Sequence, residues 1–366
     1  MRVLVAMSGG VDSSVAAALL LDEGHDVVGV TLKLWGGESD SGCCSVSDVD
    51  DARRVADRLG VEHHVFNFEI DFSARVVEPY VADHLAGRTP NPCIECNRHL
   101  KFDRLLERAR VLGFDAVATG HHARVVRRAD GTRRVARGAD RAKDQSYVLH
   151  MLDQAALARC RFPIGDRTKD AVRDEAQRRG LRTAAKPDSQ DLCFIRSTEG
   201  RRRFVERRAA LTPGRLVDLD GHVVGGVPAV ELVTVGQRRG LGAGGDGTRR
   251  FAIAVDVPQA TVLVGAEADM TVPVQPLEGV TWAAGRPPSG PVQVQCSAHG
   301  APRPGWVEVD APAPAGAARA LVRWRQPERR VAPGQAVVVY EGDEVAGGGV
   351  ASAAPPPPAP SGASPA

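Results

Sequence analysis

Short apolar runs alternate with amphipathic stretches along the first third of the chain. Residues 2–6 (RVLVA) precede a glycine-rich turn, which is typical of a buried parallel strand. The same strand pattern recurs at 26–35, 62–68 and 114–126, the last of which runs into a loop. Helical spacing that ends at a glycine marks 14–24 and 46–60. This alternation predicts an α/β fold with a parallel sheet, whose ligand lies at the carboxyl ends of the strands.

The pattern changes near Thr212, where helical spacing fades and short strands follow one another. Valine-rich segments lie at 214–225, 231–240, 250–265, 291–298, 318–324 and 335–349. The turn DLDGH at 218–222 favours a hairpin. We therefore predict an α/β domain (1–205), a small central β-rich domain (206–269) and a C-terminal β-barrel-like domain (270–347). The tail 348–366 is rich in Pro and Ala and is predicted to be disordered.

Composition adds few constraints. The 366 residues include 47 Lys and Arg and 45 Asp and Glu, so the net charge of +2 favours no class of partner. No apolar run approaches the roughly 18 residues of a membrane span, and the N-terminal run is too short for a signal peptide. We expect a cytoplasmic protein without a membrane partner. Seven cysteines in a reducing compartment are core residues, metal ligands or catalytic thiols.

The turn after the first strand reads Ser8-Gly9-Gly10-Val11-Asp12-Ser13 and has the features of a phosphate loop. It lacks the lysine of the Walker pattern. Two glycines let backbone N–H groups approach a phosphate, and the following helix adds its positive end. Asp12 would repel a bare phosphate but suits Mg²⁺ that bridges phosphates. The alternative is a glycine-rich turn in which Asp and Ser only cap the helix.

SGGVDSS at 8–14 resembles the PP-loop of the N-type ATP pyrophosphatases, which cleave ATP between its α- and β-phosphates. Four further segments narrow the resemblance: GRTPNPCIECNRHLKF at 87–102, ATGHHAR at 118–124, AKDQSYVL at 142–149 and AAKPDSQDLCFI at 184–195. Together they are similar to the bacterial tRNA-specific 2-thiouridylases. The resemblance implies that O2 of the wobble uridine (position 34) is adenylated and replaced by sulfur. The products would be 2-thiouridine, AMP and pyrophosphate.

The resemblance also implies roles for two cysteines. Cys96 would be the nucleophile and Cys193 the persulfide carrier, because a second thiol can attack a persulfide and release its sulfur while a disulfide closes. Cys93 stands where some family members have an aspartate, which leaves proton transfer near the base unassigned. The Cys93-x-x-Cys96 pair also leaves open a zinc site or a redox pair, with His99, His121 and His122 as further ligands. The remaining cysteines, Cys43, Cys44, Cys160 and Cys296, are interpreted as ordinary residues.

Binding residues follow from the same resemblance. Those implied for ATP are Ala6, Met7, Ser8, Gly9, Gly10, Val11, Asp12, Ser13, Leu32 and Gly120. Those implied around the target base are Asn91, Pro92 and Cys93, and those for tRNA are His121, Lys143, Asp144, Gln145, Arg323, Trp324 and Gln335. Arginine clusters at 123–138, 196–208 and 321–335 suit phosphate contacts, and Trp324 among arginines suits base stacking.

The implied partners are ATP with Mg²⁺, tRNAs with anticodons of the Glu, Gln and Lys type, and a cysteine desulfurase or sulfur-relay donor. Two other functions remain open on the residues alone. Another PP-loop adenylating ligase would need no pair of cysteines. A non-enzymatic, zinc-stapled RNA-binding protein would bind zinc and release no pyrophosphate.

Overall fold

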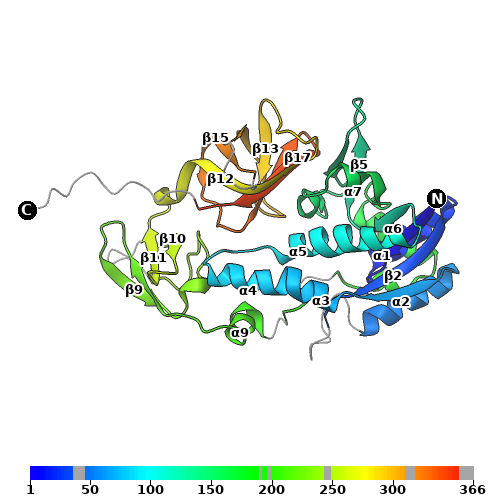
Figure 1. Cartoon of the computed structure of the whole chain (residues 1–366), viewed down its shortest axis with the longest axis horizontal. Coiled ribbons are helices and arrows are strands. Elements are labelled where there is room, and N and C mark those ends of the chain that lie inside the picture. Colours follow the sequence, from blue (N-terminus) through cyan, green and yellow to red (C-terminus); the bar gives the residue numbers. More distant parts are fainter. Residues whose placement is uncertain (36–45, 189–191, 196–198, 243–248, 310–317, 354–366) are drawn as a thin grey trace, which may run out of the picture.

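The computed structural model describes residues 1–35, 46–188, 192–195, 199–242, 249–309 and 318–353 (Figure 1). A five-stranded parallel sheet forms the first part of the chain, as the alternation of apolar and amphipathic segments predicts. In spatial order its strands are β3 (His63–Asn67), β2 (Asp26–Lys33), β1 (Arg2–Ala6), β4 (Ala116–Thr119) and β7 (Cys160–Arg161). The chain order reverses on either side of β1, so the crevice between the carboxyl ends of β1 and β4 is the favoured ligand position.

Helices cover both faces of this sheet. They are α1 (Val11–Asp22), α2 (Val46–Leu59), α3 (Glu69–Phe72), η1 (Ser73–Val77), α4 (Glu78–Leu85), α5 (Pro92–Glu95), η2 (Cys96–Arg104), α6 (Leu105–Val111), η3 (Ser146–Leu149), α7 (Gln154–Arg159), α8 (Lys169–Arg178), η4 (Arg182–Ala185) and α9 (Gly200–Glu206). Val3 and Val5 pack with α1, α2 and α8, whereas Leu4 packs with α3, α4, η2 and α6. Successive residues of β1 therefore build two separate cores.

A second, four-stranded sheet follows. Its elements are β8 (Gly214–Val217), β9 (Val223–Val227), η5 (Val230–Leu232), β10 (Phe251–Asp256), β11 (Thr261–Gly265) and η6 (Ala268–Met270), with the strands in the order β10-β11-β8-β9. The hairpin predicted around DLDGH is confirmed, because β8 and β9 pair antiparallel on either side of that turn.

Six antiparallel strands close into the expected C-terminal barrel. They are β12 (Thr271–Trp282), β13 (Val292–Gln295), β14 (Arg303–Val309), β15 (Ala320–Arg329), β16 (Ala336–Glu341) and β17 (Glu344–Ala351). The barrel closes because β12 pairs with both β15 and β17. At this closure a Cβ on Gly347 would lie 2.2 Å from the carbonyl oxygen of Thr281, so only glycine allows the two strands to approach.

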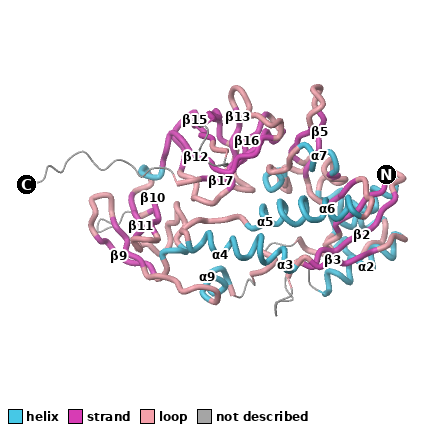
Figure 2. The backbone as a smooth tube through the Cα atoms, in the orientation of Figure 1, coloured by secondary structure: helices cyan, strands magenta, loops and turns pink. Residues whose placement is uncertain are grey.

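Three sequence expectations need correction. The segment 231–240 forms no strand, because it begins in η5 and continues in turns. The segment 114–126 is not one strand running into a loop: after β4 the chain leaves the parallel sheet and forms a hairpin, β5 (Ala123–Arg127) and β6 (Arg133–Arg137). This hairpin extends the barrel sheet, since Ala136 pairs with Glu344. Figure 2 shows the hairpin, labelled β5, projecting above α7. The predicted tail at 348–366 begins too early, because β17 runs to Ala351; residues 354–366 lie outside the described part.

None of the helices in the described ranges is long and apolar enough to cross a membrane.

Candidate active site

The predicted phosphate loop connects β1 to α1 at the favoured end of the sheet. Gly9 has a φ of +69°, and a Cβ there would lie 2.3 Å from the carbonyl oxygen of Asp48 in α2, so the position requires glycine. Gly10 precedes α1, and no described side chain caps this helix N-terminus. Among the described residues, its first N–H groups therefore remain available to a ligand or to solvent. The serine hydroxyls have local roles, since Ser13 Oγ and Ser14 Oγ both donate to the carbonyl of Gly10.

The loop after β4 lies directly against the start of α1. A Cβ on Gly120 would lie 2.5 Å from the backbone nitrogen of Ser13, so a larger residue would fill the space beside the helix N-terminus. The structure thus brings Gly120 together with the loop Ala6–Ser13, as the ATP prediction requires. Leu32 is buried in β2 as part of the core cluster on one face of the sheet.

Asp12 does not project freely from the loop. The Lys169 ammonium donates to both of its carboxylate oxygens, at 2.8 and 2.7 Å, and His122 Nε2 lies 3.2 Å from Oδ1. Burial alone would raise the pKa of Asp12, but the hydrogen bonds from His122 and Lys169 outweigh it and lower the pKa. The loop lacks a lysine in sequence, yet Lys169 at the start of α8 supplies one in space. Sequence reasoning missed this residue because its link to Asp12 is made only by the fold.

Asp188 continues the charge network away from the loop. Its carboxylate accepts from Lys169 Nζ at 2.8 Å, from Lys143 Nζ at 2.7 Å and from Arg173 Nη2 at 3.2 Å. Burial opposes its ionisation, but the hydrogen bonds from Lys143 and Lys169 prevail and lower the pKa of Asp188 to about 2. Lys143, predicted to contact tRNA, is therefore joined to the phosphate loop through one carboxylate and one further lysine.

Lys186 fixes the segment before Asp188 to the loop. Its ammonium donates to the carbonyl of Gly9 at 3.0 Å and to Asp48 and Asp51 of α2 at 2.7 Å each. Lys186 and Asp188 both belong to the AAKPDSQDLCFI segment that carries Cys193. The resemblance assigns a role only to the cysteine of this segment, but the structure shows that Lys186 contacts the phosphate loop directly and that Asp188 reaches it through Lys169.

Cys96 and Cys193 come from distant parts of the sequence and pack in the same core cluster. Cys96 begins the π-helical segment η2 and is 8% exposed, and Cys193 is half-buried. Phe194 anchors the second cysteine, since its ring lies 5.2 to 5.7 Å from those of Phe204, Tyr80 and Phe72. This aromatic packing positions the Cys193 backbone on the same side of the sheet as η2.

Of the remaining cysteines, Cys160 is buried and Cys296 is half-buried, and desolvation raises the pKa of each thiol to about 12. These values suit the predicted structural roles, because a thiol is reactive as its thiolate. Cys43 and Cys44 lie outside the described residues.

The segment predicted to surround the target base lies against the barrel and the central β domain, since Thr89 bonds to Pro333 and Gln335 of the barrel and to Thr234 of the central domain. Asn91 caps α5 by accepting from the Cys93 amide at 3.1 Å, Pro92 is buried, and Cys93 is exposed. Two residues earlier, Thr89 donates its amide to the carbonyl of Pro333 at 2.6 Å and accepts at its own carbonyl from Gln335 Nε2 at 2.5 Å. Gln335 is thereby brought beside the target-base segment.

The other predicted tRNA residues lie in different settings. The Lys143 and Arg323 side chains are 41% and 51% exposed, and their charged groups pair with Asp188 and Glu308. Gln145 accepts from the His122 amide through its side-chain oxygen. Asp144 is enclosed, since it accepts from the Arg137 guanidinium, the Gly138 amide and both donors of Ser146. His121 is 7% exposed, and burial lowers its pKa well below the usual range.

Trp324 does not present its ring for stacking in this conformation. It is 5% exposed and packs in the barrel core with Val322 and Val292. Trp306 of β14 is 40% exposed and pairs across the strands with Arg323. Among the described residues, Trp306 is therefore the aromatic side chain that faces solvent beside Arg323. The sequence did not indicate Trp306 as a stacking residue.

The histidines considered for a zinc site all have other neighbours. His99 lies between Glu95 and Asp103, His121 Nδ1 lies 2.6 Å from the Thr119 hydroxyl, and His122 faces Asp12. Within the described ranges, the side chains that gather closely enough to hold a metal ion are Asp218, Asp220 and His222, at the exposed β8–β9 turn. The described geometry gives no support to a zinc site at Cys93 and Cys96.

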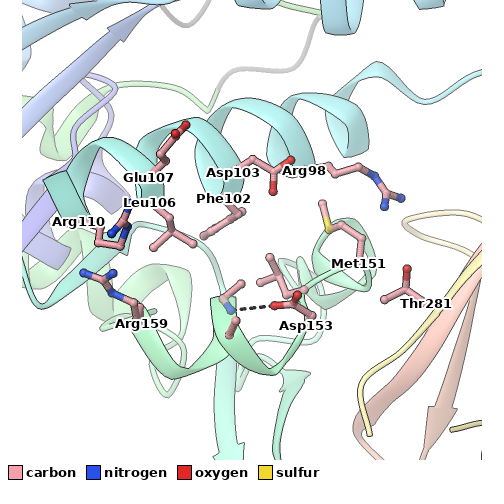
Figure 3. Close-up of a pocket in the computed structure, with 13 residues that line it drawn as sticks. Arg98, Phe102, Asp103, Leu106, Glu107, Arg110, Met151, Asp153, Arg159 and Thr281 are labelled. Carbon is pink, nitrogen blue, oxygen red and sulfur yellow. Dashed lines mark hydrogen bonds between the residues drawn. The ribbon is translucent and has the colours of Figure 1, made fainter. Parts of the chain in front are cut away.

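A cavity of about 620 Å³ opens between η2, α6, α7 and the edge of the barrel (Figure 3). Its charged lining residues are Arg98, Arg110, Arg159, Asp103, Glu107 and Asp153. Three of these groups are basic and three are acidic, and the Asp153 carboxylate caps α7. The cavity contains no residue of the phosphate loop, and its balanced charge does not favour a polyanion. The phosphate loop therefore remains the predicted nucleotide site.

A parallel sheet with a glycine loop and an uncapped helix N-terminus at its switch point defines a nucleotide-binding α/β domain. Residues 1–197 match the family model described as the tRNA methyl transferase HUP domain. Residues 202–266 match the tRNA methyl transferase PRC-barrel domain, and residues 277–351 match the aminomethyltransferase beta-barrel domain.

Two relatives extend the match to nearly the whole chain. A tRNA-specific 2-thiouridylase MnmA of Chloroflexus aurantiacus is 46% identical over 353 residues, covering 94% of this chain and 97% of its own. One of Mycobacteroides abscessus is 47% identical over 361 residues, covering 95% and 98%. The chain belongs to the tRNA-specific 2-thiouridylase family.

Among solved structures, a U34-tRNA thiolase of Methanococcus maripaludis is 18% identical with a TM-score of 0.34, covering 57% of this chain and 65% of its own. We base nothing on a likeness of that size.

Proposed function

We propose that the protein is an ATP-dependent tRNA 2-thiouridylase. It adenylates O2 of the wobble uridine (position 34) and replaces that oxygen by sulfur, giving 2-thiouridine, AMP and pyrophosphate. The observation that carries the proposal is the packing of Cys96 and Cys193 in one cluster on the sheet that also bears the phosphate loop. Adenylation and sulfur transfer both need to reach one base, so the packing of the two cysteines in the domain of the phosphate loop supports the proposal.

ATP is a substrate that the loop region fits. The N–H groups at the start of α1, the space kept open by Gly120 and the ammonium of Lys169 are all suited to phosphate oxygens. The proposed contacts are Ala6, Met7, Ser8, Gly9, Gly10, Val11, Asp12, Ser13, Leu32 and Gly120. The Asp12 carboxylate fits Mg²⁺, which would neutralise phosphate charge during adenylation. Binding requires Lys169 to exchange its carboxylate partner for phosphate.

Sulfur transfer follows from the chemistry of the two thiols. The terminal sulfur of a Cys193 persulfide attacks C2 of the adenylated uridine, and AMP leaves with the former O2. The Cys96 thiolate then attacks Sγ of Cys193 and breaks the bond to the transferred sulfur, which remains on the base. A Cys96–Cys193 disulfide closes, and an external thiol reductant reopens it. The persulfide is restored by a donor of the cysteine desulfurase or sulfur-relay type.

RNA is proposed to lie along the target-base segment, where that segment contacts the barrel and the central β domain. Asn91, Pro92 and Cys93 would surround the target base, with Gln335 beside them through its bond to Thr89. Lys143 and Arg323 offer exposed charge to phosphates, while His121, Asp144, Gln145 and Trp324 support this surface from within. The substrates proposed are tRNAs with Glu, Gln and Lys anticodons, in the cytoplasm.

The test is tRNA-dependent release of pyrophosphate together with mass spectrometry of the tRNA nucleosides. We expect 2-thiouridine to appear when ATP, a sulfur donor and substrate tRNA are all present. Asp12→Ala should abolish pyrophosphate release, because the metal loses its carboxylate. Near-normal release would mean that Asp12 is only a helix residue.

The same assay separates the competing functions. An amide-forming PP-loop ligase would release pyrophosphate unchanged after Cys96→Ser and would make no 2-thiouridine. A methyl transferase, the reaction in the family-model descriptions, would add mass to the base without consuming ATP at the loop. A zinc-stapled RNA-binding protein would hold one zinc per chain and release no pyrophosphate.

A further inference from the structure

Two carboxylates and three cations form a continuous chain from the phosphate loop to the proposed RNA surface. Asp12 and Asp188 both accept from the ammonium of Lys169, which lies 2.7 and 2.8 Å from Asp12 and 2.8 Å from Asp188. Asp188 also accepts from Lys143 and Arg173. Lys169 is thus shared between the proposed metal ligand and a carboxylate that also holds a proposed tRNA contact.

The two lysines differ in their freedom to leave this chain. The Lys169 side chain is 8% exposed, so it must keep an anionic partner. The Lys143 side chain is 41% exposed and can turn to an RNA phosphate at little desolvation cost. The backbone near Asp188 is held in place by Lys186, which bonds to Gly9, Asp48 and Asp51. The ammonium groups of Lys143 and Lys169 can therefore change partners while the Asp188 carboxylate keeps its position.

We propose that Asp188 is a positioning residue through which tRNA bound at Lys143 prepares Asp12 for Mg·ATP. When an RNA phosphate withdraws Lys143, Asp188 loses one of its three cations and attracts Lys169 more strongly. Lys169 then loosens its hold on Asp12, whose carboxylate becomes available to the metal. This inference rests on the proposed function, which places ATP at the loop and tRNA at Lys143.

Coupling of this kind is reciprocal. If tRNA tightens the binding of Mg·ATP, Mg·ATP must tighten the binding of tRNA by the same factor. Adenylation would then be favoured when the base to be modified is present, which limits the cleavage of ATP without substrate.

The experiment measures the affinity of the full chain for a non-hydrolysable ATP analogue with Mg²⁺, by calorimetry, with and without a substrate tRNA. We expect tRNA to tighten the binding of the analogue by about 5-fold or more, the lower end of typical coupling between sites. Asp188→Asn should still bind each ligand alone, with the coupling reduced to less than about 2-fold. Asp174→Asn is the matched control, because Asp174 is an exposed aspartate of the same helix as Lys169.

A second variant tests the sign of the effect. Lys143→Gln removes the cation that RNA would withdraw. In the absence of tRNA it should therefore tighten the binding of the ATP analogue by several-fold, and it should weaken the binding of tRNA. Because the Lys143 side chain is 41% exposed and Asp188 keeps Lys169 and Arg173, this variant is expected to fold even if Asp188→Asn does not.

The outcomes separate the inference from the function on which it rests. If wild type binds both ligands without coupling, or if Asp188→Asn couples them as wild type does, the role of Asp188 is refuted and the function stands. Unchanged or weaker binding of the analogue by Lys143→Gln refutes the proposed exchange of partners. If wild type binds neither ligand, the proposed function and the inference fall together.

Discussion

Replacing Lys169 by methionine removes the one cation that contacts both Asp12 and Asp188 in the described structure. The side chain is nearly isosteric, so the change acts mainly on charge. Asp188 keeps Lys143 and Arg173, but Asp12 keeps only His122 at 3.2 Å. The variant therefore leaves a carboxylate without its strongest partner at the start of α1.

The size of the effect follows from the burial of the three groups. Removing one partner of a buried ion pair costs about 3–5 kcal/mol. The Asp12 and Asp188 side chains are 30% and 26% exposed, so solvent relieves part of that cost. We expect Lys169→Met to lower the free energy of unfolding of the α/β domain by about 2–3 kcal/mol, within the usual range for a broken buried network. Its thermal transition should fall by roughly 5–10 °C.

The assay is urea unfolding followed by circular dichroism, with pyrophosphate release measured on the same preparations. Lys33→Met is the control, because Lys33 pairs with Glu69 at the surface and is 47% exposed, so its loss should cost less than about 1 kcal/mol. Adding Asp12→Asn to Lys169→Met should recover part of the lost stability, since it removes the unpaired charge. If Lys169→Met is no less stable than Lys33→Met, or if the double variant is less stable still, the charge network does not stabilise this domain.

Three further predictions concern the thiols, the RNA surface and pH. Cys96→Ser and Cys193→Ser should each lose thiolation by about 10³-fold or more, and mass spectrometry should find labelled sulfur retained on Cys96→Ser but absent from Cys193→Ser; normal turnover by Cys96→Ser would exclude it as nucleophile. The double variant Arg323→Gln, Arg325→Gln should weaken the binding of all substrate tRNAs. The slope of the logarithm of tRNA affinity against the logarithm of salt concentration should become shallower by roughly 1–2 units, whereas an unchanged slope would mean that β15 does not contact RNA. The pKa of Asp188 is lowered to about 2 from an ordinary value near 3.9, so its ion pairs stabilise the fold above about pH 4 and are lost as the pH falls toward 2. Urea titrations should show that the difference in stability between wild type and Asp188→Asn shrinks as the pH falls from about 4 to about 2. A difference independent of pH would contradict this.

The parts of the fold that the sequence predicts are those set by local periodicity. The valine-rich run before Gly9 becomes β1, and the helical spacing at 46–60 becomes α2 (Val46–Leu59). The position of Gly9 and Gly10 between a strand and a helix indicated the phosphate loop, and only Gly9 has the positive φ that demands glycine. These features depend on neighbouring residues, and no long-range contact is needed to infer them.

The contacts of Lys169 could not be inferred in this way. Its partners lie far away in sequence, and α8 reaches the loop only because α1 and α8 pack on the same face of the sheet. The charge chain through Asp188 has the same origin. A motif places residues near one another in sequence, whereas these ion pairs depend on tertiary packing.

Trp324 is a different case, because the sequence itself predicts its burial and the interpretation as a stacking residue overlooked this. In ARALVRW the alternation places Ala320, Val322 and Trp324 on one face and Arg323 on the other. The apolar face is the barrel core, and Trp324 follows it inward. The tryptophan was assigned by its arginine neighbours in sequence, although period-two spacing separates it from them in space.

The β5–β6 hairpin has a consequence for how the protein is synthesised. Its edge strand is made early, but its partner β17 is among the last described segments to leave the ribosome. Until then the hairpin presents unpaired backbone groups, and its arginines discourage strand addition by another chain. Once β16 and β17 arrive, Arg134 binds Glu341, Arg128 binds Glu344, and Ala136 pairs with Glu344, so this part of β6 gains its partner. A product truncated before the barrel would keep this edge exposed, so premature termination should yield aggregating chains rather than a working nucleotide-binding domain.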